Sequence, residues 1–112
     1  MLAAWPLSAG ERLSVKISPA VCFAPANLIV RAIVEADVRN RAIEIVAESD
    51  DFYRASEVQL DGENAPRTTT FEFRSLPSGS YEVTAILLDA QSKPLSSVRG
   101  QVNVLANGGG GS

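Results

Sequence analysis

The feature that most constrains this fold is an alternation of apolar and polar side chains with a period of two. In residues 28–36, apolar side chains occupy every second position, and the charged Arg31 and Glu35 fall between them. Successive side chains of a β-strand point to opposite faces, so this pattern predicts a strand with one buried face. A helix would instead need apolar positions three and four residues apart.

Seven segments carry this pattern, and turn-forming residues separate them. They are residues 12–18, 28–36, 43–48, 56–61, 69–74, 81–88 and 98–104. Short strands at such regular spacing are typical of two sheets packed face to face. We therefore predict an all-β fold, a seven-stranded antiparallel Greek-key β-sandwich of immunoglobulin or fibronectin type.

One short motif adds a family resemblance. The sequence Leu-Pro-Ser-Gly-Ser-Tyr-Glu-Val at 76–83 resembles the corner between strands E and F of bacterial immunoglobulin-like, fibronectin type III-like and prealbumin-like modules. In such a corner Leu76 fills the end of the sandwich, Gly79 allows a positive φ, and the Tyr81 hydroxyl bonds to nearby backbone. The resemblance is specific over these eight residues. It implies an extracytoplasmic adhesive, scaffolding or spacer module and no particular ligand.

The two ends of the chain differ from this core. Residues 1–10 are apolar and end in small residues, which indicates a signal-peptide remnant or an N-terminal arm. Residues 11–106 would form the immunoglobulin-like β-sandwich, and the Gly-rich 107–112 a flexible tail or linker. No apolar run reaches the roughly 18 residues of a membrane span. We expect a secreted or periplasmic location.

The amino-acid composition argues against several kinds of catalytic and binding site. The chain has no histidine, which removes the usual general base and the Ser-His and Cys-His nucleophile pairs. Its 10 Lys and Arg are dispersed among 13 Asp and Glu, which argues against a nucleic-acid partner. The single Cys22 suits a small buried apolar position. We expect no enzyme, no catalytic residue and no cofactor.

Loop carboxylates are the remaining candidates for a ligand site. The topology would bring one group of them to the same end of the sandwich: Asp37, Asp61, Glu63, Asn64 and Asp89. Calcium takes oxygen ligands from such loops, but the sequence lacks an Asp-x-Asp-x-Asp spacing, and turn carboxylates are ordinarily solvated. We predict no metal site. A calcium- or carbohydrate-binding accessory domain of a larger extracellular enzyme remains the alternative, with Phe52 and Tyr53 as the aromatic side chains for a sugar.

Apolar residues at outward positions suggest a binding surface. If 43–48 and 81–88 pair, as in the predicted fold, then Val46, Ile86 and Leu88 share the outer face of one sheet. Exposed apolar patches commonly mark partner surfaces. The competing interpretation is that these side chains are scattered or covered by the N-terminal arm with Trp5. We predict a noncatalytic module for protein–protein interaction, adhesion or spacing, which binds a protein partner or a second copy of itself.

Overall fold

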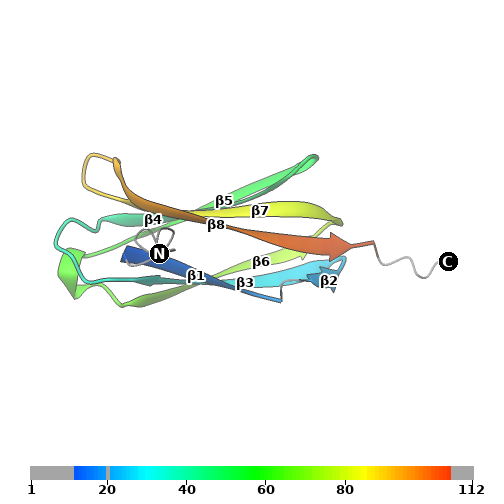
Figure 1. The fold of residues 1–112 in the computed structure, drawn as a ribbon, viewed down its shortest axis with the longest axis horizontal. Coiled ribbons are helices and arrows are strands. Elements are labelled where there is room, and N and C mark those ends of the chain that lie inside the picture. The colour runs from blue at the N-terminus through cyan, green and yellow to red at the C-terminus, as the bar shows by residue number, and fades with distance from the viewer. Residues whose placement is uncertain (1–11, 20, 107–112) are drawn as a thin grey trace, which may run out of the picture.

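The computed structural model describes residues 12–19 and 21–106, which form two β-sheets stacked as layers (Figure 1). The prediction of an all-β sandwich is confirmed. The strands of the described residues are β1 (Leu13–Ser18), β2 (Val21–Phe23), β3 (Ala26–Val34), β4 (Ala42–Ser49), β5 (Phe52–Gln59), β6 (Thr68–Leu76), β7 (Gly79–Leu88) and β8 (Pro94–Leu105), with one 3-10 turn, η1 (Gly62–Asn64). The predicted N-terminal arm (1–10) and Gly-rich tail (107–112) lie outside the described residues.

The strands divide unequally between the two sheets. One sheet has the order β1-β3-β6 and the other β2-β8-β7-β4-β5. Within the described residues every pairing is antiparallel except that of β2 with β8, which is parallel. The predicted pairing of the strand at 43–48 with that at 81–88 is present as β4 with β7. The chain passes from one sheet to the other between β3 and β4.

The prediction of seven antiparallel strands is wrong in two respects. The described residues contain an eighth strand, β2, and this strand pairs in parallel. A strand of three residues between Pro19 and Pro25 is too short to show an alternation, and its partner β8 is far away in the sequence. In addition, β5 begins at Phe52, so Phe52 and Tyr53 belong to a strand, whereas the alternation placed them between the predicted strands 43–48 and 56–61.

The core lies between the sheets and is built from the predicted inward rows. Its fully enclosed side chains come from both layers, including Leu28, Val30, Ile43, Ile45 and Val83. The sheets approach closely where β1 passes β8. There a Cβ atom on Gly100 would lie 2.8 Å from Ile17 Cδ1, so only glycine fits without displacement.

The predicted corner around Tyr81 is confirmed. Leu76 is fully buried, and the Tyr81 hydroxyl donates a hydrogen bond to the Pro77 carbonyl oxygen at 2.7 Å. The Phe52 ring meets the Tyr81 ring edge to face, with centroids 5.9 Å apart. Burial raises the pKa of Tyr81, because the low-polarity surroundings disfavour the charged phenolate. Gly79 has a φ of 157° and packs against Ser49.

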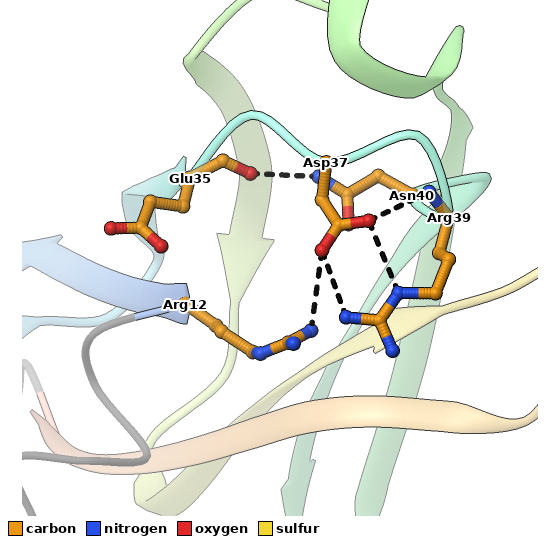
Figure 2. Close-up of polar contacts among 5 residues, drawn as sticks. All are labelled: Arg12, Glu35, Asp37, Arg39 and Asn40. Carbon is orange, nitrogen blue, oxygen red and sulfur yellow. Dashed lines mark hydrogen bonds and ion pairs between the residues drawn. The ribbon is translucent and has the colours of Figure 1, made fainter.

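The turn between β3 and β4 is organised by a compact polar cluster (Figure 2). Asp37 Oδ1 accepts hydrogen bonds from the Arg39 backbone N–H at 2.8 Å and from Nε at 3.1 Å, and its Oδ2 lies 3.7 Å from Arg12 Nη1. These contacts, above all the hydrogen bonds from the Arg39 side chain, hold the pKa of Asp37 well below its usual range. The buried Asn40 donates from Nδ2 to the Glu35 carbonyl oxygen at 2.9 Å.

Candidate binding face

The three predicted binding residues lie together on the outer face of the five-stranded sheet. Val46 is on β4, and Ile86 and Leu88 are on β7. Val46 stands opposite Thr84, so Ile86 is its diagonal neighbour and Leu88 is the next outward residue along β7. All three side chains are half-buried. The register therefore places the three apolar side chains as neighbours on one face, and this patch stays a predicted binding site.

The same face carries glutamates that oppose one another across strands. Glu44 on β4 stands directly opposite Glu57 on β5, and Glu48 on β4 stands opposite Glu82 on β7. Like charges in directly opposite positions destabilise a sheet. Among the described residues, one ion pair compensates this set, from Arg99 Nη1 to Glu82 Oε2 at 3.2 Å. We call this surface, with its apolar patch, the acidic face.

The outer face of the three-stranded sheet has the opposite sign. Lys16 on β1 stands directly opposite Arg31 on β3, again a pair of like charges. Half-buried Ile29 and Ile33 flank Arg31 along β3. On β6, Arg74 Nη2 forms an ion pair with Glu72 Oε1 at 3.3 Å. We call this surface the basic face.

Sequence reasoning missed a second apolar area at the edge of the five-stranded sheet. Val21 and Phe23 on β2 and Leu105 on β8 are 57%, 63% and 43% exposed. Phe23 and Leu105 are partners in the parallel register, so the two side chains share one face. Because β2 was not predicted, the sequence offered no reason to place these side chains outside. Cys22 between them packs against the core, but it is half-buried and not fully buried as predicted.

A polar hollow of about 380 Å³ opens between these two parts of the outer surface. It is lined by carboxylate, hydroxyl and amide side chains, namely Glu48, Ser49, Asp50, Ser80, Tyr81, Glu82, Gln101 and Asn103. Neither Glu48 nor Asp50 has an ion-pair partner in the described part of the chain. The sequence could not indicate this hollow, because its lining comes from β4, β7, β8 and the turn after β4, and the register of the strands brings these residues together.

The predicted loop carboxylates gather at one end of the sandwich, as expected, but Asp37 is held by arginines. The η1 turn lies against the β3–β4 turn, where the Gly62 backbone N–H donates to the Asn40 carbonyl oxygen at 2.9 Å. The hydrogen bond to Asp37 and the charge of Asp37, with a smaller effect from the charge of Asp89, raise the pKa of Arg39. Within residues 12–19 and 21–106, no three His, Cys, Asp or Glu side chains are placed to hold a metal ion.

The two aromatic side chains that the alternative prediction assigned to sugar binding point to opposite faces of the sheet. Phe52 faces the core and contacts Tyr81, whereas Tyr53 is 63% exposed on the acidic face, directly opposite Glu48. No helix in the described part of the chain is both long and apolar enough to cross a membrane.

Comparison with solved structures shows what this fold resembles. A superoxide reductase (neelaredoxin) variant from Ignicoccus hospitalis aligns with a TM-score of 0.68 and 18% identity, over 88% of this chain and 84% of that one. A family 76 glycoside hydrolase from a bovine Bacteroides thetaiotaomicron strain aligns with a TM-score of 0.59 and 16% identity, over 82% of this chain and 20% of that one. The CARDB domain of a Pyrococcus furiosus protein, in complex with di-metal ions, aligns with a TM-score of 0.51 and 17% identity, over 85% of this chain and 94% of that one.

These likenesses show the fold, and they correct one prediction. No family model and no curated protein matches the sequence. The prediction that the chain is not an enzyme is contradicted, because three of the similar structures are of a superoxide reductase, an enzyme with this fold over most of its length. The prediction rested on the absence of histidine, which removes one common general base, but the absence of one residue type does not decide whether a fold of this kind carries catalysis.

Proposed function

We propose that this chain is an extracytoplasmic, immunoglobulin-like module that binds a protein partner through the acidic face. The immunoglobulin-like assignment is supported by strand pairing. β3 and β6 share one sheet and β4, β7 and β8 share the other, which corresponds to strands B and E and to strands C, F and G of immunoglobulin domains. The likeness to a CARDB domain supports the same assignment.

The observation that carries the binding proposal is the composition of the acidic face. Val46, Ile86 and Leu88 form one apolar patch. The four glutamates beside it oppose one another in two pairs, and among the described residues only Glu82 also forms an ion pair, with Arg99. Folding alone gains nothing from such an arrangement, because directly opposite like charges oppose strand pairing. A partner surface that covers the patch and supplies positive charge would remove this cost.

Two further features support the proposal that this module contacts other proteins or other domains. Val21, Phe23 and Leu105 form an exposed apolar area at the sheet edge, the kind of surface that protein contacts use. The fold also aligns with one fifth of the glycoside hydrolase chain, so the same architecture occurs as one part of a much larger protein. An adhesive or spacer role in a larger assembly fits both features.

Affinity capture with matched variants tests the proposal. Leu88→Lys places a charge in the patch, and Val38→Lys makes the same change at an exposed apolar residue of the β3–β4 turn. We expect wild type and Val38→Lys to retain the same bound protein from the source organism's extracellular fraction, and Leu88→Lys to lose it. Equal capture by all three proteins, or no capture by wild type, contradicts the proposal. Unfolding of Leu88→Lys would place Leu88 in the monomer core and also contradict it.

The alternative of a carbohydrate-binding accessory domain is favoured by one observation. The polar hollow presents carboxylate, hydroxyl and amide groups, and the exposed Tyr53 ring stands opposite Glu48 at its side. Retention on an oligosaccharide gel that is lost in Tyr53→Ala would support this alternative. A rise of several degrees in the melting temperature with millimolar calcium would support the calcium-binding form.

A further inference from the structure

We propose that the partner of the acidic face is the basic face of a second copy of this chain, so that copies stack front to back. The proposal rests on the proposed function and specifies its partner. Figure 1 shows the two sheets as separate layers, so their outer faces point in opposite directions. One copy can therefore present its acidic face to one neighbour and its basic face to another.

The charges of the two faces are complementary. The acidic face carries four glutamates and one arginine in register across its strands, and the basic face carries Lys16, Arg31 and Arg74 with one glutamate. Each face holds at least one pair of like charges in directly opposite positions, such as Lys16 with Arg31. Stacking brings the unlike sets together and relieves the repulsion on both faces in a single contact.

The apolar side chains of the two faces are also placed to meet. Ile29 and Ile33 flank Arg31 on the basic face, and Ile86 and Leu88 follow one another on the acidic face. All four are half-buried in the single copy, so each retains apolar surface that a second sheet can cover. Sheets pack face to face at about 10 Å through such side chains, as the two sheets within one copy already do.

A symmetric contact between two identical faces is disfavoured by the same charges. Two acidic faces placed together would bring the Glu44–Glu57 and Glu48–Glu82 pairs of both copies into one interface. Two basic faces would do the same with Lys16 and Arg31. The contact is therefore heterologous, and repetition of it produces open chains of copies instead of a closed pair.

Sedimentation velocity tests the stacking directly. At about 50 mM NaCl the sedimentation coefficient of the full chain should rise with protein concentration up to about 1 mM, and at about 500 mM NaCl the rise should be lost, because salt screens the facing charges. A protein that stays monomeric over this whole range at low salt overturns the proposal.

Charge-reversal variants separate front-to-back stacking from other contacts. Lys16→Glu/Arg31→Glu reverses the basic face, and Glu48→Lys/Glu57→Lys changes one member of each glutamate pair on the acidic face. Each variant alone should be monomeric, and an equimolar mixture should associate again, because one intact acidic face then meets one intact basic face. The control Arg67→Glu/Lys93→Glu has the same change in net charge as Lys16→Glu/Arg31→Glu, but at loop residues off both faces, and it should associate like wild type.

The outcomes distinguish this inference from the proposed function. If Lys16→Glu/Arg31→Glu associates as wild type does, or the mixture of variants fails to associate, stacking is wrong. Capture of a different protein that depends on Leu88 would still support the proposed function. If Leu88→Lys retains both the captured protein and the self-association, the acidic face is not the binding surface, and both proposals fall.

Discussion

The β3–β4 turn and the acidic face both place charges side by side, but in opposite ways. In the turn, Asp37 lies between Arg39 and Arg12, with hydrogen bonds to Arg39 of 2.8–3.1 Å (Figure 2). On the acidic face, glutamate stands opposite glutamate in two cross-strand pairs. In the turn, opposite charges lie together and attract one another, whereas on the acidic face like charges lie together and repel.

This difference separates charged groups that stabilise the folded state from charged groups that do not. Asp37 and Arg39 lie two residues apart in the sequence, and their contacts hold the turn at which the chain passes from one sheet to the other. The facing glutamates come from separate strands and oppose the pairing of those strands. Substitutions should therefore lower stability in the first group and leave it unchanged or raise it in the second. The predictions below test this division, starting with the largest effect.

The largest effect is expected at Tyr81, a buried polar group that serves the fold in the same way as the turn. Tyr81→Ala leaves a cavity beside Phe52 and should lower the free energy of unfolding by about 3 kcal/mol or more. Tyr81→Phe loses the hydrogen bonds of the hydroxyl to the Pro77 carbonyl oxygen and to the Ser49 side chain, without leaving a cavity, and should cost about 1 kcal/mol. Denaturant melts of both variants measure these values. A Tyr81→Ala variant as stable as wild type would refute the role of the corner.

The pH dependence of stability tests whether Tyr81 stabilises the fold as a neutral phenol. Its pKa is raised in the folded state, so the neutral phenol is favoured by folding. The associated stability is fully present below the unfolded-state value near 10.0 and is lost as the pH rises through the raised folded value. The difference in stability between wild type and Tyr81→Phe should therefore shrink above pH 10, as measured by denaturant melts. A difference that grows with pH would show that the phenolate is the favoured form.

A smaller loss is expected at Asn40 in the turn. Asn40→Ala removes the hydrogen bond from Nδ2 of the buried Asn40 to the Glu35 carbonyl oxygen and should cost about 1–2 kcal/mol, because this part-buried acceptor loses its donor. The exposed Asn64→Ala in η1 is the matched control and should change stability little. Thermal melts compare the two variants. Equal effects would show that the Asn40 contact contributes nothing specific to the turn.

The sequence predicts those parts of the molecule that depend on local pattern. Alternation alone places Leu28 and Val30 inward and Ile86 outward, and the motif around Tyr81 predicts its hydrogen bond to backbone. The register between strands that are distant in the sequence cannot be predicted from any local pattern. The opposition of Glu48 to Glu82 and the parallel strand that carries Phe23 therefore appear only in the structure.

Acidic pH should weaken the turn selectively. The pKa of Asp37 is lowered by Arg39, so its contribution to stability is present above the ordinary value of 3.8 and is lost as the pH falls through the lowered value. Asp37→Asn should therefore be less stable than wild type at pH 7, and the difference should narrow below pH 3.8. Denaturant melts at both pH values measure it. A difference that is independent of pH would assign the effect to side-chain shape and not to charge.

The smallest effect, and the one of opposite sign, is expected on the acidic face. Glu48→Gln removes one member of the Glu48–Glu82 pair without changing the size of the side chain, so the free energy of unfolding should rise by a few tenths of a kcal/mol, about the cost of one exposed like-charge pair. The gain should be larger at low salt, because salt screens the repulsion. Glu82→Gln should gain less, since it also loses the ion pair to Arg99. Chemical denaturation at two salt concentrations resolves these differences. If Glu48→Gln instead lowers stability, the facing glutamates serve the fold as the turn charges do, and the division between the two regions fails.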